Sequence, residues 1–502
     1  MRAPFTQRLL AVFFILAGCQ HHPATSLQPG QHVIPQNISA TELVFKAPAA
    51  ARVELWHSGN GWTAPVNAAR KGDLWVLPVT QLGLPAGRHE FKFVADGTWE
   101  EGPNHRLNLG TDGKPGPLPS LYLTWRRDPT TTMVVCWDGD DPTEQPLVQW
   151  RARGDEAWSQ SRGRSAPLPH TGRTAHQVEL TGLAPGRRYE FRAGPQAGTH
   201  SFVTMPATLK APLRFVEGGD VYGDERLMDQ MNRFAASLDP AFVVLGGDLG
   251  YENGQPELAG RWLRFMQSLS QHLRAPDGRM IPVLAAVGNH EVRREDQNLI
   301  RPGAMPKNSR DRRGLAPLYF ASFPFPGDPG YNVLDCGNYL SLVFLDTNHL
   351  NLVAGRQSAW LARTLEARKN RPHLLPVYHV PAYPSVRAYD GEVNQAIRRA
   401  WVPLFEKAGV RLSFEHHDHS LKVTPPIRSG RRRPDGIVFV GDGSWGVKVR
   451  QVHDAASTWY LNFSRSANGL NEVTLEPGRR TVRVLTANGR EVHRVEQTLD
   501  AD

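Results

Sequence analysis

Cysteine is scarce in this sequence. Only Cys19, Cys136 and Cys336 occur among its 502 residues. Cys19 belongs to the N-terminal segment, whereas Cys136 and Cys336 lie in apolar, strand-like surroundings of different predicted domains. We expect the latter two to be small buried residues rather than a disulfide pair. The scarcity also excludes zinc binding through cysteine, so any metal must be held by His, Asp, Asn or Tyr.

Long apolar runs are lacking as well. The most apolar run covers residues 9–16, follows two arginines and is too short to span a bilayer as a helix. It ends in LAGC, which resembles a bacterial lipoprotein signal and implies cleavage before Cys19 and acylation of that residue. Gln20, rather than an aspartate, favours the outer membrane of the bacterial cell envelope. An ordinary signal peptide with a chance cysteine is the alternative to this signal over residues 1–19.

The sequence has fewer acidic than basic residues, 49 against 58, which gives a formal net charge of +9. Such a balance allows nucleic-acid binding. No nucleic-acid-binding motif is recognisable and the chain is expected to be exported, so we expect no nucleic-acid partner. The excess suits an anionic substrate, an anionic membrane surface or a solvated face.

After a polar linker at residues 20–40, residues 41–112 show short strand patterns with turns at regular spacing, which predicts a β-sandwich. The stretches VELWHSGNGW, GDLWVLPV and LPAGRHEFKFVADGTW resemble glycogen-binding modules. The resemblance implies a glucan site at Trp62, Lys92 and Trp99, where indoles stack on sugar rings and an ammonium donates to hydroxyls. A structural spacer is the alternative.

Residues 116–205 predict a second β-sandwich. The stretch HQVELTGLAPGRRYEFRAG alternates apolar and polar residues around a Pro-Gly turn, which resembles a fibronectin-type-III-like domain. The resemblance places Tyr189 at the corner of that domain. We expect this module to be structural.

From residue 212 to 502 the pattern changes to α/β. Apolar runs of strand length alternate with helical spacing such as that of residues 227–238. Several runs end in polar side chains of the types that ligate metals, and the carboxyl ends of neighbouring strands open on one crevice. These residues at the run ends are Asp220, Asp248, Asn289, His290, Asp346, His379, His417 and His419.

The order of Asp220, GDxxY, GNHE, VxxH and HxH resembles the binuclear metallophosphoesterases of the calcineurin-like superfamily, and within them the purple acid phosphatases. The tyrosine of GDxxY, Tyr251, is the distinguishing piece. The fold implied for the whole chain is multidomain α/β plus all-β. Two N-terminal β-sandwich modules precede an α/β domain with two mixed sheets flanked by helices.

The same resemblance implies a metal for each half of the site. A trivalent iron would be held by Asp220, Asp248, Tyr251 and His419. A divalent zinc, iron or manganese would be held by Asp248, Asn289, His379 and His417. Asp248 would bridge the two metals, and a phenolate from Tyr251 would favour iron(III). His290 matches the histidine that orients or protonates the phosphate, and is a catalytic candidate together with Asp248.

Three departures from the family pattern leave alternatives open. Tyr222 stands two residues after Asp220, where the wider superfamily has a ligand histidine, so it competes with Tyr251 for the phenolate role. His416 replaces a glycine beside the histidine pair and could compete as a ligand or support one. The stretch after His379 lacks the substrate-facing histidines of plant-type enzymes, which leaves Tyr383 and Arg387 as substitutes.

These features predict an exported, lipid-anchored hydrolase of phosphate monoesters, of the acid phosphatase type, that uses a metal-bound hydroxide. Its partners would be a phosphorylated small or macromolecular substrate, the membrane and a glucan. A phosphodiesterase on the same metals is one alternative. A glycan-binding surface lipoprotein with a degenerate phosphatase domain is another.

Overall fold

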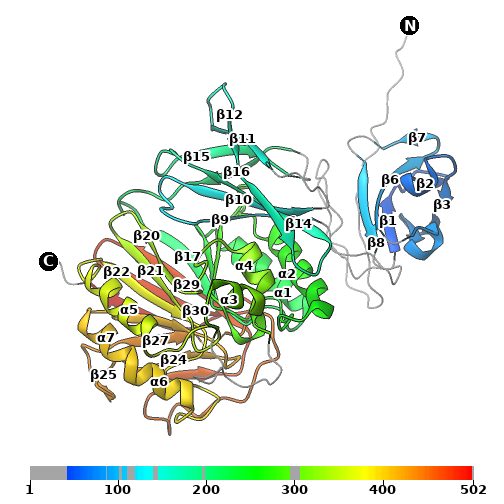
Figure 1. Cartoon of the computed structure of the whole chain (residues 1–502). Coiled ribbons are helices and arrows are strands. Elements are labelled where there is room, and N and C mark those ends of the chain that lie inside the picture. Colours follow the sequence, from blue (N-terminus) through cyan, green and yellow to red (C-terminus); the bar gives the residue numbers. More distant parts are fainter. Residues whose placement is uncertain are drawn as a thin grey trace. The chain divides into compact units, whose positions relative to one another are not determined.

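The computed structural model describes residues 42–85, 87–100, 104–109, 119–139, 145–194, 198–293, 306–441 and 443–499. The chain divides into two compact units, Met1–Leu118 and Pro119–Asp502 (Figure 1). The expected signal with Cys19 and the linker at 20–40 lie outside the described residues. No helix in the described part of the chain is long and apolar enough to cross a membrane.

The first unit is a β-sandwich of a three-stranded and a five-stranded sheet. Alternate residues of its strands point inward, and Phe45 and Phe93 stack with ring centroids 4.8 Å apart in the core. The three-stranded sheet contains β1 (Glu42–Lys46), β5 (Leu74–Pro78) and β4 (Ala69–Lys71). The five-stranded sheet contains β3 (Val66–Asn67), β2 (Val53–His57), β6 (Gly87–Ala95), β7 (Thr98–Trp99) and β8 (His105–Leu109).

The second unit begins with another β-sandwich, of two four-stranded sheets. The hydroxyl of Tyr189 accepts a hydrogen bond from Ala184 N at 2.7 Å, which closes the expected corner. One sheet contains β13 (Arg164–Leu168), β14 (Arg173–Leu180), β10 (Met133–Gly139) and β9 (Leu121–Thr124). The other contains β12 (Ser159–Arg162), β11 (Leu147–Ala152), β15 (Arg188–Arg192) and β16 (His200–Val203).

This sandwich shares its core with the α/β part that follows. Trp125 packs edge-on against Phe242, with centroids 5.8 Å apart, and the hydroxyl of Tyr122 donates to Ser322 O at 2.7 Å. Both cysteines of the described residues are buried and free, as expected: Cys136 lies on β10, and Cys336 lies elsewhere in the same unit. The sandwich therefore supports the α/β domain mechanically.

The α/β domain is built on two mixed sheets that face each other across an apolar core (Figure 1). In both sheets the parallel strands are central to the site. The six-stranded sheet contains β19 (Val283–Ala285), β18 (Val243–Leu245), β17 (Leu213–Gly218), β29 (Gly469–Glu476), β30 (Arg479–Thr486) and β31 (Glu491–Thr498). The seven-stranded sheet contains β20 (Asn332–Cys336), β21 (Leu340–Leu345), β22 (His373–Tyr378), β23 (Leu412–Glu415), β27 (Val438–Gly441), β24 (Leu421–Val423) and β28 (Phe463–Arg465). A separate hairpin joins β25 (Ile427–Arg428) to β26 (Arg431–Arg432).

Helices cover the outer faces of both sheets. On the six-stranded sheet lie α1 (Glu225–Ser237) and α2 (Ala259–His272), and on the seven-stranded sheet lie α5 (Arg356–Glu366), α6 (Glu392–Ala400) and α7 (Val402–Lys407). Two short helices, α3 (Ser309–Leu315) and α4 (Pro317–Ser322), follow β19 in the chain. Helix α1 follows the predicted spacing: Met228, Met231 and Ala235 are buried, and the Asp224 side chain caps its first turn by accepting from Leu227 N at 2.9 Å. The predicted architecture of two β-sandwiches and a helix-flanked pair of mixed sheets is confirmed.

Candidate metal centre

The predicted ligands converge at the carboxyl ends of parallel strands. Asp220 follows β17 and Asp248 follows β18, while Asn289 follows β19 in the six-stranded sheet. From the facing sheet, His379 follows β22 directly, and His417 and His419 follow β23. Strand direction brings these ends to one side of the two facing mixed sheets, because parallel strands of a sheet end at the same edge.

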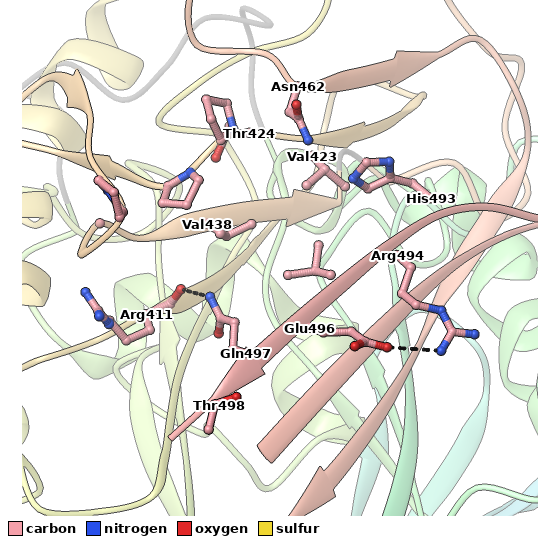
Figure 2. Close-up of a pocket in the computed structure, with 15 residues that line it drawn as sticks. Arg411, Val423, Thr424, Val438, Asn462, His493, Arg494, Glu496, Gln497 and Thr498 are labelled. Carbon is pink, nitrogen blue, oxygen red and sulfur yellow. Dashed lines mark hydrogen bonds and ion pairs between the residues drawn. The ribbon is translucent and has the colours of Figure 1, made fainter. Parts of the chain in front are cut away.

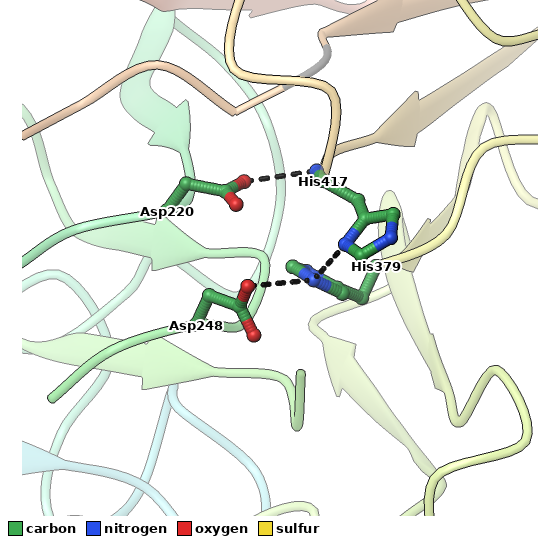
Figure 3. Close-up of side chains that lie close together, drawn as sticks. All are labelled: Asp220, Asp248, His379 and His417. Atoms are coloured by element: carbon green, nitrogen blue, oxygen red, sulfur yellow. Dashed lines mark hydrogen bonds and ion pairs between the residues drawn. The ribbon is translucent and has the colours of Figure 1, made fainter. Parts of the chain in front are cut away.

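Four of these side chains form a tight cluster, drawn in Figure 3. Each of Asp220, Asp248, His379 and His417 offers one ligand atom, and these atoms all lie within 4.8 Å of one another. His379 Nε2 is 3.0 Å from His417 Nδ1 and 3.1 Å from Asp248 Oδ2. The backbone N–H of His417 donates to Asp220 Oδ2 at 2.9 Å, which ties the two sheets together at the cluster.

The remaining predicted ligands surround the cluster. Asn289 Oδ1 lies 3.2 Å from His379 Nε2, on one side. On the other side, His419 Nε2 lies 3.0 Å from Asp220 Oδ1. The hydroxyl of Tyr251 is 3.3 Å from both Asp220 Oδ1 and His419 Nε2. The donors predicted for iron, Tyr251 and His419, therefore lie together at Asp220. Those predicted for the divalent metal, Asn289, His417 and Asp248, lie together at His379.

The structure separates the two tyrosines. Tyr251 has its hydroxyl among the predicted ligands, and its ring stacks on His290 with centroids 4.2 Å apart. Tyr222 is buried elsewhere: its ring lies under the Arg261 guanidinium, 4.3 Å away, and burial and the nearby Glu225 raise its pKa to about 12. Its hydroxyl is directed to the helices α1 and α2, so the geometry favours Tyr251 as the phenolate donor.

His416 does not compete for a metal. Its ring is fully buried between the sheets, where Nδ1 is hydrogen-bonded to Tyr378 O at 2.8 Å and Nε2 is paired with Glu217. Glu217 in turn accepts from Asn471 Nδ2 at 2.8 Å. Of the two roles left open for His416, that of a competing ligand does not fit the structure, because both of its ring nitrogens are already engaged by Tyr378 O and Glu217.

His290 is held in one orientation beside Asp248. Its backbone N–H donates to Asp248 Oδ1 at 2.9 Å, and Nδ1 is hydrogen-bonded to Asn253 Oδ1. Nε2 lies 3.9 Å from Asp248 Oδ2, on the cluster side. An amide oxygen can only accept a hydrogen bond, so the proton of a neutral His290 is assigned to Nδ1 and Nε2 is left free to face a ligand.

The loops that carry the cluster have an unusual backbone. Asp220, Asp248, Tyr251, His417 and His419 all have φ between 54° and 79°, in the left-handed region that side-chain-bearing residues rarely adopt. Such conformations cost roughly 1–3 kcal/mol each and persist where function requires them. Two glycines make room for these loops. A Cβ at Gly247 would lie 2.9 Å from His379 Nδ1, and one at Gly443 would lie 1.7 Å from Asp220 Oδ2.

Charge in the cluster is strongly coupled. Burial opposes ionisation of Asp248, but the positive charges of His379 and His290 hold the pKa of its carboxyl well below the usual range. Burial would lower the pKa of His379, but the Asp248 carboxylate outweighs it and raises that pKa to about 9. A metal that binds between these side chains takes the place of the proton on His379.

The donor set fits a pair of metal ions. Asp248 Oδ2 is buried and accepts no well-formed hydrogen bond from any residue that the structure describes. Its only close polar neighbours are ring nitrogens of the same cluster. Carboxylate oxygens, an amide oxygen, imidazoles and a phenol are the donors that suit iron(III) beside zinc, iron(II) or manganese. Asp248, which is paired with His379 here, would then serve as a ligand to the metals.

Three further buried acidic residues, not singled out from the sequence, lie near the cluster. Glu291, in the GNHE run, accepts hydrogen bonds from the backbone N–H groups of Asp248, Leu249 and Gly288 at 2.6–2.9 Å, and so joins two ligand-bearing loops. Burial and the Asp248 charge raise the pKa of Glu291 to about 8. Glu252 is also fully buried, yet neither of its carboxyl oxygens has a partner among the described residues. The third is Asp418, between the two ligand histidines. The signal for Glu291 was present in the motif, but its partners are backbone atoms that no sequence pattern names.

Asp346, which follows strand β21, shapes a turn of the backbone and is not part of the cluster. Asp346 accepts from the backbone N–H groups of His349 and Leu350 at 2.9 and 2.8 Å and so shapes a turn. His349 is fully buried, with its ring centroid 5.6 Å from that of His379, and its Nε2 is hydrogen-bonded to Thr347 Oγ1 at 2.9 Å. These residues pack behind the cluster rather than within it.

In the first unit, the predicted glucan residues lie together. Trp62, Lys92 and Trp99 line a shallow hollow of about 390 Å³, with Asn104 as a fourth member that the sequence analysis did not find. The rings of Trp62 and Trp99 lie 6.4 Å apart, and Trp99 is 47% exposed. The hollow presents two flat apolar faces and two polar groups to solvent.

Another hollow, of about 410 Å³, lies at the amino ends of β23 and β27, away from the ligand-bearing ends (Figure 2). Its charged side chains are already engaged: Arg494 pairs with Glu496 at 3.3 Å, and the Arg411 guanidinium donates to Asp435 O. No group of metal-ligating side chains is found here among the described residues. The hollow offers no chemistry like that of the cluster.

Comparison with known proteins agrees with the geometry. Residues 118–204 match the purple acid phosphatase N-terminal domain, and residues 213–421 match the calcineurin-like phosphoesterases. Purple acid phosphatase 21 of Arabidopsis thaliana is 26% identical over 326 residues, which cover 62% of this chain and 68% of the relative. Purple acid phosphatase 18 of the same plant is 22% identical over 394 residues, which cover 72% and 83%.

Solved structures show the same fold. A purple acid phosphatase from yellow lupin (Lupinus luteus) seeds superposes with a TM-score of 0.64, at 14% identity, over 91% of this chain and 93% of the other. The two domain matches in their order, the relatives and the clustered donors support one conclusion. The chain is a purple acid phosphatase-like metallophosphoesterase, a metal-dependent hydrolase of phosphoric esters with a binuclear metal centre.

Proposed function

We propose that the protein hydrolyses phosphate monoesters as an acid phosphatase in the cell envelope. One observation carries the catalytic part: Asp220, Asp248, His379 and His417, drawn from four strand ends of two sheets, place their ligand atoms within 4.8 Å of one another. A degenerate domain would have no reason to retain a buried cluster of carboxylates and imidazoles and five left-handed residues at this place.

The proposed ligands divide between two metals. Asp220, Asp248, Tyr251 and His419 would hold iron(III), and Asp248, Asn289, His379 and His417 would hold zinc, iron or manganese. Bound there, the two ions would supply Lewis acidity that activates water and stabilises charge on the transferred phosphoryl group. A phenolate is a hard anionic donor, which is why Tyr251 favours the trivalent ion.

The protein's own groups supply orientation and protons. Glu291 fixes the loops that carry Asp248 and Asn289, through its three backbone hydrogen bonds. His290, with Nδ1 held by Asn253 and Nε2 toward the cluster, would donate a hydrogen bond or a proton to a phosphate oxygen or the leaving group when it is protonated. Its burial lowers its pKa, which suits a group that exchanges protons below neutral pH.

Hydrolysis of p-nitrophenyl phosphate and of bis-p-nitrophenyl phosphate, with metal analysis of the same sample, tests the proposal. We expect close to two metals per chain, one of them iron, and faster hydrolysis of the monoester. Faster hydrolysis of the diester would establish the phosphodiesterase alternative. A metal-free protein without either activity would support the degenerate alternative.

We also propose that Cys19 carries a lipid anchor that holds the protein in the bacterial outer membrane. The LAGC ending of the N-terminal apolar run supports this. Cells fed labelled palmitate should label the parent protein and not a Cys19→Ser variant, which should remain uncut or appear soluble. Equal label in both would rule the anchor out.

A second candidate function belongs to the first unit. We propose that its hollow binds glucan, because Trp62 and Trp99 offer stacking faces while Lys92 and Asn104 offer donors. Bound glucan would hold the phosphatase near a polysaccharide or a phosphorylated sugar.

A further inference from the structure

The residue between the two ligand histidines organises the neighbouring loop. Asp418 is fully buried, and its Oδ2 accepts from the backbone N–H groups of Ser385 and Val386 at 2.8 Å each. Its Oδ1 accepts from the guanidinium of Arg387, which also donates to His417 O at 2.6 Å. Arg387 is therefore held against the ligand-bearing loop while 32% of its side chain stays exposed.

A second arginine is fixed on the same side. Arg450 ends the segment that follows β27, and its backbone N–H donates to His419 O at 3.1 Å. His419 Nδ1 is hydrogen-bonded to Lys448 O at 3.2 Å, and Gly446 N donates to Asp220 O at 3.0 Å. Residues 446–450 are thus tied at three points to Asp220 and His419.

Both arginines are held against the loop that carries the ligand histidines, Arg387 through His417 O and Arg450 through His419 O. None of the residues that the structure describes forms a hydrogen bond or ion pair with the Arg450 guanidinium, although Arg450 is only partly exposed. Burial and the positive charge of Arg387 lower its pKa, while Asp220, Asp418 and Tyr251 act in the opposite direction. Arg450 therefore lies within electrostatic reach of both Arg387 and the cluster. An anion beside the ligand histidines would be attracted by both guanidinium groups.

Tyr383, the other substitute suggested by the sequence, does not reach the site. It is 1% exposed and packs on Phe439, with ring centroids 4.8 Å apart. The substrate-facing histidines of plant-type enzymes have no counterpart in the same stretch of this chain. Guanidinium groups suit the missing role, since their planar fork matches phosphate oxygens and stays charged at all working pH values.

We propose that Arg387 and Arg450 form an anion clamp beside the metal cluster, which binds the non-bridging oxygens of the substrate phosphate and selects dianionic monoesters over monoanionic diesters. The clamp rests on the proposed function for its catalytic meaning, but its anion binding stands on its own. Asp418 acts as a positioning residue, because it holds Arg387 through the ligand-bearing loop.

Phosphate binding to the metal-loaded full chain tests the clamp. Isothermal titration with inorganic phosphate should show affinity about ten- to a hundredfold weaker for Arg450→Gln than for the parent, as for loss of a charged hydrogen bond. Arg450→Lys keeps the charge and loses the planar guanidinium group, so its phosphate affinity should lie between those of the parent and Arg450→Gln. Arg431→Gln removes an equal charge from the exposed strand β26 and should bind phosphate like the parent. Metal content is measured on every sample.

Kinetics separate the clamp from a purely structural role. Arg450→Gln should raise the KM for p-nitrophenyl phosphate about tenfold or more. The same variant should raise the KM for bis-p-nitrophenyl phosphate less. Unchanged phosphate affinity in a fully metal-loaded Arg450→Gln variant, or a parent that binds no phosphate, would overturn the clamp even if the parent hydrolyses esters. A parent that binds phosphate through Arg450 but hydrolyses neither ester would keep the clamp and refute the proposed function.

Discussion

The metal cluster and the hollow of the first unit are both concave, yet they are built in opposite ways. Asp248 is 1% exposed and its loop has left-handed residues, whereas Trp99 is 47% exposed on a short strand of two residues. Donors that hold a metal must meet within a few ångströms, so many loops are strained to bring them there. A stacking platform needs only a flat face presented to solvent. A metal cluster and the proposed sugar-stacking surface therefore place different demands on the same chain.

Loss of the bridging carboxylate should have the largest effect. Asp248→Asn replaces a charged oxygen that both metals would share, so hydrolysis should fall by at least about a hundred- to a thousandfold and metal content should fall below two per chain. Steady-state rates and metal analysis measure both. Trp99→Ala in the other region should hydrolyse like the parent. Near-parental activity of Asp248→Asn would mean that the cluster is not the active site.

Loss of the Glu291 carboxylate, which joins two ligand-bearing loops, should have the next largest effect. Glu291→Gln leaves one backbone N–H facing an amide N–H₂ in a buried place, so metal affinity should fall by about ten- to a hundredfold. Glu252→Gln is the matched control, because the carboxyl of Glu252 accepts no hydrogen bond from the described residues. Competition with a chelator compares the variants. Equal affinities for both would show that Glu291 does not position the loops.

The two tyrosines sharpen the comparison within the α/β domain. Tyr251→Phe keeps the ring that stacks on His290 and removes the phenol oxygen, so the visible absorption of the oxidised protein should vanish and iron should be held more loosely. Some hydrolysis should survive with two divalent ions. Tyr222→Phe should keep the colour. Colour lost only in Tyr222→Phe would reverse the assignment, and a colourless, fully active parent would indicate two divalent metals.

The smallest effect is expected in the first unit. Trp99→Ala removes buried apolar contact area and, in addition, about 0.5–1.5 kcal/mol of stacking free energy from glucan binding. This loss should abolish retardation of the full chain in a glycogen-containing gel. Trp459→Ala is the control, since Trp459 is the other large apolar side chain that is exposed among the described residues, at 40%, and lies in the second unit. Absence of retardation in the parent would leave the first unit as a spacer.

Much of the architecture could be predicted because it rests on periodicity. The helix over residues 225–237, the strand runs and the alternation of the two β-sandwiches follow from spacings of 3.6 and 2. The side of the sheet on which Asp220, Asp248 and His379 meet follows from strand direction. The segment that carries Arg450 was missed, because its only signal is one further apolar run, and its contacts with Asp220 and His419 are backbone hydrogen bonds.

The sequence by itself determined which donor types are available and in what order they follow the strands, since composition and period are local properties. Only the tertiary structure separated Tyr251, whose hydroxyl lies among the predicted ligands, from Tyr222, turned His416 toward Glu217, and held Arg387 against Asp418. These choices depend on loop dihedral angles and on partners about two hundred residues away. Two neighbouring side chains at a strand end point to opposite faces, and no local pattern tells which face holds the metal.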